Sequence, residues 1–134
     1  MQRRIAFWFT VVVLILFWLV ALRFNFSHST MSVRFSWLGI PACTQISPPF
    51  QLSDVPEGTD RLTFNMTDRQ VPTFNHGGST IKYAGDNMVA QGAIKYTGPC
   101  PPRDEHHIYR WTVQAIDPAG NVLDTATAEA AFPP

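Results

Sequence analysis

The chain has 134 residues, of which 46% are hydrophobic, and its ten Lys and Arg residues balance its ten Asp and Glu residues. This length accommodates one domain and an appendage. From residue 31 onward, seven basic and ten acidic residues give a net charge of −3 and form no basic patch. Nucleic acid is therefore not expected as a partner.

The N-terminal segment predicts a membrane anchor. Residues 5–22 contain a single polar side chain, Thr10, in eighteen residues, which is long enough to cross most of a bilayer core as a helix. A cleaved signal peptide is the alternative. The run is long and rich in aromatic residues, however, and no Ala-x-Ala pattern follows it. We therefore interpret residues 5–24 as a retained transmembrane signal anchor.

The charges beside this run predict its orientation. Arg3 and Arg4 lie before it, and Arg23 alone lies at its end, which places residues 1–4 in the cytoplasm by the positive-inside rule. Residues 25–32 are short, polar and rich in Ser, and are interpreted as a linker. Residues 33–134 are then an exported domain.

The exported part is predicted to be mainly β, because turn signals recur every eight to twelve residues and no amphipathic helix follows the anchor. Several segments alternate between apolar and polar side chains or have the composition of strands. They cover residues 33–40, 61–67, 79–83, 87–96, 107–117 and 122–132. The segment at 61–67 ends at Asp68, which places a carboxylate at a strand end, where sites are often built. Residues 46–50, with two prolines, are predicted as a stiff loop.

A second stiff loop leads into the most regular strand. Three of the four residues after Gly98 are prolines, which excludes helix and central strand from residues 98–102. The following strand places His107 and Tyr109 on the same face as its apolar residues. A rigid loop before a strand that opens with a histidine and a tyrosine can hold a small polar pocket.

The two cysteines, Cys43 and Cys100, suit an oxidising compartment, where an even number favours a disulfide. Such a bond would tie the first loop of the domain to the proline loop; two small buried thiols are the alternative. No metal site is predicted, because no Cys-x-x-Cys or His/Cys pattern is present. His106 and His107 are adjacent on a strand, so they point to opposite faces.

Five motifs in one order carry a family resemblance. They are Ser47-Pro48-Pro49-Phe50, Val55-Pro56-Glu57-Gly58-Thr59, Asp68 with Pro72, Gly98-Pro99-Cys100-Pro101-Pro102, and His107-x-Tyr109-x-Trp111 with Ala115-Ile116-Asp117. This order resembles the phosphatidylethanolamine-binding protein family, which includes the Raf kinase inhibitor proteins, and most closely its bacterial branch. The resemblance implies a β-sandwich with a cavity at one end that accepts phosphate, acetate or a phospholipid head group. The ligand-binding residues that it implies are Asp68, His76, Gly98, Pro99, Cys100, Pro101, His107 and Tyr109.

The sequence also departs from the family pattern. Gln70 replaces the second acid of the family's Asp-Pro-Asp-Ala-Pro motif, so the carboxylate pair is absent. His76 lies closer to Pro72 than the family spacing. The segments before Gly98 and after Asp117 are shorter than in the family. We expect a trimmed version of the fold, preceded by a single transmembrane helix.

These observations favour a non-enzymatic accessory subunit of a larger membrane protein complex, anchored in the bacterial inner membrane with its domain in the periplasm. The alternative is a free-standing, membrane-tethered binding module for a small anion or phospholipid head group. An enzyme is not expected, because Cys100, the one candidate nucleophile near His107, is flanked by prolines and can bond to Cys43. No cofactor is expected.

Overall fold

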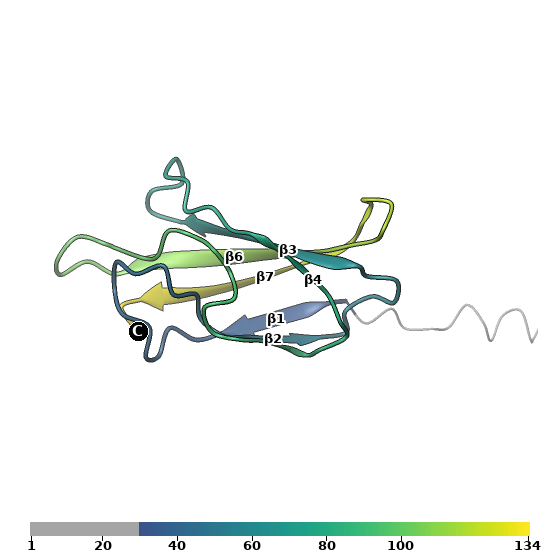
Figure 1. Ribbon diagram of the computed structural model, residues 1–134. Coiled ribbons are helices and arrows are strands. Elements are labelled where there is room, and N and C mark those ends of the chain that lie inside the picture. The colour runs from purple at the N-terminus through teal and green to yellow at the C-terminus, as the bar shows by residue number, and fades with distance from the viewer. Residues whose placement is uncertain (1–29) are drawn as a thin grey trace, which may run out of the picture.

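The computed structural model describes residues 30–134, which form seven strands (Figure 1). The strands are β1 (Ser32–Phe35), β2 (Phe50–Ser53), β3 (Arg61–Asp68), β4 (Thr80–Lys82), β5 (Met88–Val89), β6 (His107–Ile116) and β7 (Val122–Phe132). The predicted anchor at residues 5–24, the cytoplasmic residues 1–4 and most of the linker lie outside the described residues. Within residues 30–134, no helix has the length and hydropathy needed to cross a bilayer.

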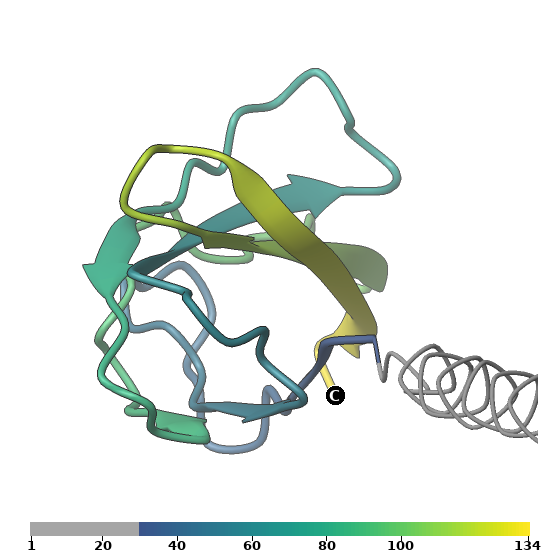
Figure 2. The ribbon, with the colours of Figure 1, turned by 90° about the vertical axis from the view of Figure 1, so that its right-hand side faces the viewer.

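The strands form two sheets that face each other as layers (Figures 1 and 2). One sheet has the order β1-β2-β5 and the other the order β4-β3-β6-β7. All neighbouring strands are antiparallel. The structure thus confirms the prediction of a mainly β fold.

The core lies between the sheets and follows from the alternation within β3 and β6. Every second residue of β6, from His107 to Ala115, is buried, and β3 buries its own alternate residues. From the opposite sheet, the Phe50 ring lies 4.9 Å from that of Phe64 and 5.0 Å from that of Trp111. A shift of one residue would expose each of these apolar sets, so the register is strongly determined. In that register Asp68 pairs with Tyr109.

Three strand predictions need correction. Of residues 33–40, only the first three belong to a strand, β1 (Ser32–Phe35). Gly39, at φ 79°, and the turn bond from Ile40 N to Trp37 O end the strand pairing there.

Strand β2 follows the proline loop directly and was not predicted, because it has only four residues. Of residues 87–96, only Met88–Val89 form a strand. Gly92, at φ 78°, and the turn bond from Ala93 N to Ala90 O end the pairing there. Ile94 is nevertheless buried, and its N–H donates to the Ser47 hydroxyl at 3.2 Å.

The folded domain includes Met31, two residues before the predicted boundary. Its side chain is buried and its N–H donates to Asp124 at 2.8 Å. Because Asp124 lies near the start of β7, the first described residues lie at the opposite end of the sandwich from Phe132 (Figure 1).

A disulfide joins Cys43 to Cys100, with the two Cα atoms 4.6 Å apart. Of the two alternatives left open by the sequence, the bond is the one observed. The Cys43 N–H also donates to the Pro99 carbonyl at 2.8 Å. Gly98 packs so closely that an added Cβ would overlap the Thr44 carbonyl oxygen. The proline loop is therefore fixed against the loop that follows β1.

Candidate functional site

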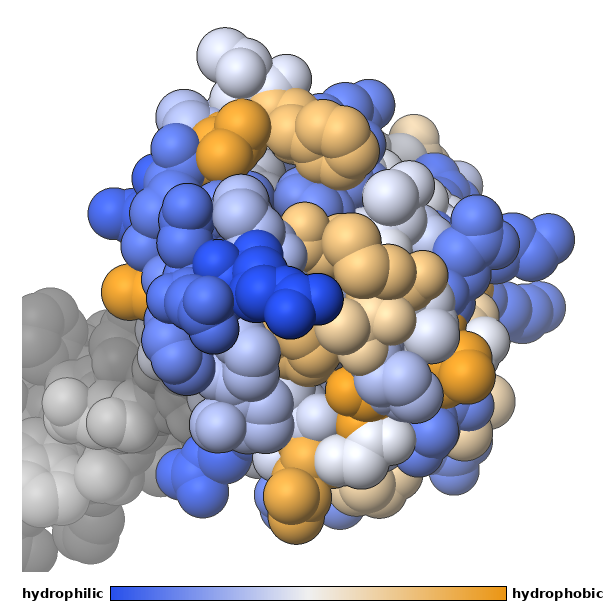
Figure 3. Space-filling view, turned by 90° about the vertical axis from the view of Figure 1, so that its left-hand side faces the viewer, coloured by the Kyte–Doolittle hydropathy of each residue, from blue (hydrophilic) through white to orange (hydrophobic). Residues whose placement is uncertain are grey.

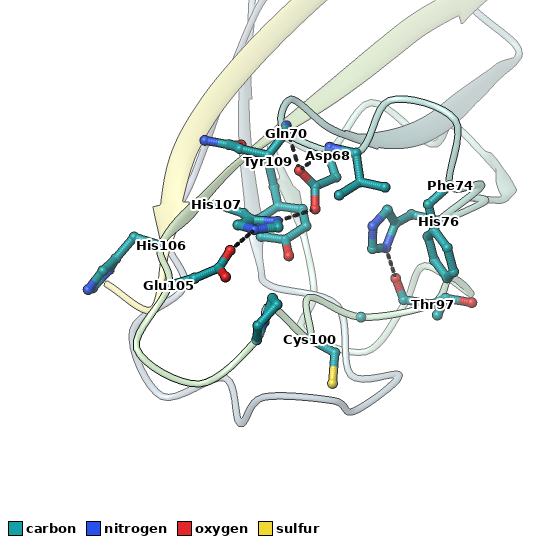
Figure 4. A pocket seen from close by; sticks show the side chains of 13 residues that line it. Asp68, Gln70, Phe74, His76, Thr97, Cys100, Glu105, His106, His107 and Tyr109 are labelled. Atoms are coloured by element: carbon teal, nitrogen blue, oxygen red, sulfur yellow. Dashed lines mark hydrogen bonds and ion pairs between the residues drawn. The ribbon is translucent and has the colours of Figure 1, made fainter.

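The end of β3 and the start of β6 meet at one end of the sandwich, where the loops after β3 and before β6 enclose a cavity of about 500 Å³ (Figure 4). The cavity is lined by polar, titratable and aromatic side chains together with the proline loop. Its lining residues are Asp68, Gln70, Val71, Phe74, His76, Thr97, Gly98, Cys100, Pro102, Glu105, His106, His107 and Tyr109.

Asp68 and His107 form a buried pair in the cavity wall. Nδ1 of His107 lies 2.6 Å from Oδ2 of Asp68, and their side chains are 7% and 5% exposed. Oδ1 of Asp68 accepts the backbone N–H groups of Gln70 and Val71 at 2.8 and 3.1 Å. Burial alone would raise the pKa of Asp68, but the bonds from His107 and these two N–H groups outweigh it and lower that pKa. Asp68 is therefore held as a carboxylate.

His107 also contacts a second carboxylate. Its Nε2 lies 3.2 Å from Oε2 of Glu105, whose side chain is 58% exposed. A turn places Glu105 there: its N–H donates to the Pro102 carbonyl, and Asp104 adopts a positive φ of 66°. The hydrogen bond to Asp68 raises the pKa of His107, burial opposes this, and the bond to Glu105 raises it further. The result favours an imidazolium between two carboxylates.

His76 is buried on the opposite side of the cavity (Figure 4). Its Nδ1 lies 2.8 Å from the Thr97 carbonyl oxygen. Because a carbonyl can only accept, Nδ1 of His76 carries the proton of this bond. The Thr97 N–H donates in return to the His76 carbonyl at 2.7 Å. Edge contacts with Phe74 and Tyr109, at centroid distances of 4.6 and 5.4 Å, fix the ring orientation.

Tyr109 is fully buried at the base of the cavity, and its ring stacks on that of His107 at 6.2 Å. Burial, and then the nearby Asp68 carboxylate, raise the pKa of the Tyr109 hydroxyl above its ordinary value. The hydroxyl therefore stays protonated near neutral pH and can serve as a hydrogen-bond donor.

The structure brings together six of the eight residues predicted for the site, namely Asp68, His76, Gly98, Cys100, His107 and Tyr109. Pro99 and Pro101 are not among the lining residues, and Pro99 is fully buried behind the wall. The loop at residues 98–102 was predicted to line the cavity, and Pro102 does so as well. The lining residues that the sequence did not predict are Gln70, Val71, Phe74, Thr97, Glu105 and His106. Residues 103–105 were predicted as a polar turn before His107, but the geometry that directs the Glu105 side chain inward could not be predicted from the sequence.

Gln70, on the loop after β3, has a structural contact. Its Oε1 accepts the Ile108 backbone N–H at 2.8 Å. This bond ties the loop after β3 to the start of β6. Gln70 therefore helps to hold Asp68 beside His107.

The chain is similar in fold to solved protein structures. No protein-family profile and no curated protein matches the sequence. Among solved structures, the phosphatidylethanolamine-binding protein (PEBP) homologue CT736 of Chlamydia trachomatis matches with a TM-score of 0.58 and 20% identity, over 78% of this chain and 98% of CT736. YbcL of Escherichia coli, a member of the mammalian PEBP family, matches with a TM-score of 0.55 and 16% identity, over 78% of this chain and 98% of YbcL. The fold is that of the PEBP proteins.

Within this PEBP-like fold, the cavity has the size of a small-molecule site. It combines the His107 imidazole, the Tyr109 hydroxyl and the His76 ring with the apolar edge of Phe74. Such a set can orient a small polar molecule by hydrogen bonds. Among residues 30–134, no group of three or more His, Cys, Asp or Glu residues is arranged to hold a metal ion.

Proposed function

We propose that the chain is a PEBP-like binding protein whose cavity takes a small anion, either free phosphate or the phosphate of a phospholipid head group. The observation that carries this proposal is the imidazole of His107, held against Asp68 at 2.6 Å in the wall of a cavity of about 500 Å³. A protonated ring in a partly desolvated site is a strong donor to phosphate oxygens.

Two neighbouring features support binding rather than catalysis. The protonated hydroxyl of Tyr109 can supply a neutral donor beside His107. Cys100 is bonded to Cys43, so it offers no thiolate, which is the reactive form of cysteine. The proposal is therefore a non-enzymatic role.

The test is an NMR titration of the full-length chain with inorganic phosphate. The His107 and Tyr109 resonances are expected to shift in a saturable way. His107→Gln should abolish the Tyr109 shift. His106→Gln is the matched control: His106 also lines the cavity, but its ring points away from His107 (Figure 4) and contacts the Pro133 carbonyl at 3.3 Å, so the Tyr109 shift should persist. Unchanged wild-type resonances at His107 and Tyr109 would refute the proposal.

A second candidate function is an accessory subunit of a larger membrane complex. It is favoured by apolar side chains exposed near the cavity end, separated by polar ones (Figure 3). Phe74 and Val71, on the cavity rim, are 50% and 42% exposed, and Leu38 is 81% exposed. Such side chains can pack against a partner protein.

This second proposal includes the anchor at residues 5–24 in the bacterial inner membrane, with the domain in the periplasm. Met31 lies at the opposite end of the sandwich from the cavity. A domain tethered through its first residues would therefore present the cavity end away from the bilayer. An alkaline phosphatase fusion at the C-terminus is expected to be active if this orientation holds, and inactive if the C-terminus is cytoplasmic.

The partner can be tested by affinity purification of the full-length chain from native membranes in mild detergent. We expect co-purifying subunits, and we expect Phe74→Ser to lose them. Met88→Ser is the control, because Met88 is also exposed, at 58%, but lies on β5. A monodisperse monomer without co-purifying subunits would contradict the accessory role.

A further inference from the structure

Both nitrogen atoms of the His107 ring are already engaged by carboxylates of this chain. Nδ1 contacts Asp68 at 2.6 Å, and Nε2 contacts Glu105 at 3.2 Å (Figure 4). With the ring protonated, these three side chains carry a net charge of −1. An anion that approaches His107 therefore meets an occupied donor and an excess of negative charge.

The two carboxylates differ in how firmly they are held. Asp68 is 5% exposed and accepts two further backbone N–H groups. Glu105 is 58% exposed and lies on the surface turn closed by its own N–H and the Pro102 carbonyl. Rotation of the Glu105 side chain into solvent would not disturb the core, whereas removal of Asp68 would break a buried network. Glu105 is thus the displaceable partner of His107.

We propose that Glu105 is an internal competitor for the cavity: its carboxylate occupies the Nε2–H of His107 that an external anion would use, and an anion binds by displacing it. This inference rests on the proposed anion-binding function. The other titratable groups that face His107 are Tyr109, stacked on its ring, and Asp68. Neither can move aside without opening the buried wall.

The competition has a consequence for selectivity. An incoming anion must exchange with a carboxylate that already makes a charge-assisted hydrogen bond. Acetate has the same carboxylate group as Glu105. Acetate also loses translational and rotational entropy when it binds, whereas the tethered Glu105 side chain does not. A phosphate dianion carries more charge and more acceptor oxygens. The wild type should therefore prefer phosphate to acetate.

The experiment is calorimetric titration of the full-length chain with inorganic phosphate, in non-ionic detergent because residues 5–22 are strongly apolar. Glu105→Gln removes the competing charge and is expected to tighten phosphate binding by roughly tenfold. Asp104→Asn is the matched control, because it removes the same charge from the adjacent exposed position. Its affinity is expected to stay within about twofold of the wild type.

The outcomes separate this inference from the function on which it rests. Tighter binding by Glu105→Gln alone supports the competitor. Equal phosphate affinity of the wild type and Glu105→Gln would contradict the proposal that Glu105 competes with the anion. An equal gain in affinity in Asp104→Asn would contradict it as well. Either result would leave the anion-binding function supported. No binding by either the wild type or Glu105→Gln overturns both. The same titrations with glycerophosphoethanolamine distinguish a head group from free phosphate, and Glu105→Gln should gain affinity for whichever source binds.

A second readout is independent of any ligand. The His107 pKa, followed through its ring proton shifts by NMR, should fall in Glu105→Gln and stay unchanged in Asp104→Asn. An unchanged His107 pKa in Glu105→Gln would show that Glu105 does not engage the ring in solution, and would overturn the competitor.

Discussion

Replacing Asp68 with Asn tests whether charge, and not shape alone, holds the cavity wall. The asparagine Oδ1 can still accept the N–H groups of Gln70 and Val71, which lie 2.8 and 3.1 Å from Asp68 Oδ1. The carboxylate oxygen that meets Nδ1 of His107 at 2.6 Å is lost. Asp68→Asn therefore replaces one member of a buried ion pair with a neutral amide, whose NH2 donor takes the place of the acceptor that faced Nδ1.

The pH dependence of the effect follows from the two pKa shifts. The folded-state pKa of Asp68 lies below the ordinary value of 3.8, so its stabilisation is complete above pH 3.8 and is lost as the pH falls through the lowered pKa. The folded-state pKa of His107 lies above 6.5, so its stabilisation is complete below pH 6.5 and is lost as the pH rises through the raised pKa. The pair contributes most between these two ordinary values.

Breaking a buried pair by removing one partner costs about 3 to 5 kcal/mol. Because Asn keeps two of the three hydrogen bonds, we expect a loss of about 3 kcal/mol in the free energy of unfolding at about pH 5. Once His107 is neutral, the wild type keeps only a hydrogen bond from Nδ1–H to the carboxylate, so the loss should shrink to about 1.5 kcal/mol. Urea unfolding followed by near-ultraviolet circular dichroism, across a pH series, measures both values.

Glu57→Gln, at an exposed position on a turn, is the control and should show no comparable change with pH. If Asp68→Asn loses the same free energy of unfolding on both sides of the His107 titration, the pair is not held by charge. The argument for an imidazolium in the cavity would then fail.

Two further changes test the loops around the cavity. Replacing Cys43 and Cys100 together with Ser opens a link across 57 residues, and urea unfolding should show a loss of about 4 kcal/mol; a reducing agent should reproduce this loss in the wild type and have no effect on the variant. Gly98→Ala should cost about 3 kcal/mol, because the added Cβ overlaps the Thr44 carbonyl oxygen. Gly92→Ala, with open space around it but a φ of +78°, should cost only about 1 kcal/mol, and equal losses in thermal unfolding would contradict the steric argument.

The sequence predicted the long strands better than the short ones. Strand β7 was predicted with the observed bounds, 122–132, and β6 ends one residue before the predicted 117. Both strands make backbone hydrogen bonds to neighbouring strands over many residues. The alternation of side chains along them is therefore long enough to predict a strand. Strand β2 has four residues after two prolines, and its pairing with β1 and β5 depends on contacts distant in sequence. Its four residues do alternate between apolar and polar side chains, but an alternation this short beside two prolines was not enough to predict a strand.

The site residues on strands were likewise predicted better than those on loops. Asp68, His107 and Tyr109 were placed together by the family resemblance. The register, which pairs Asp68 with Tyr109, shows how a strand end and a strand start bring them together. Glu105 and Phe74 lie on loops. Their inward positions depend on turn geometry and on packing against His107 and His76, which no periodicity encodes.

Tyr109 lies on an inner strand, β6, where it pairs with Asp68 of β3 and with Ala130 of β7, and this position has a consequence for motion. Amide groups of interior strands exchange with solvent only through large openings of the fold, while surface turns exchange through small ones. The amides of β3 and β6 at the cavity should therefore exchange only when the domain unfolds, whereas those of the turn that carries Glu105 should exchange while the domain stays folded.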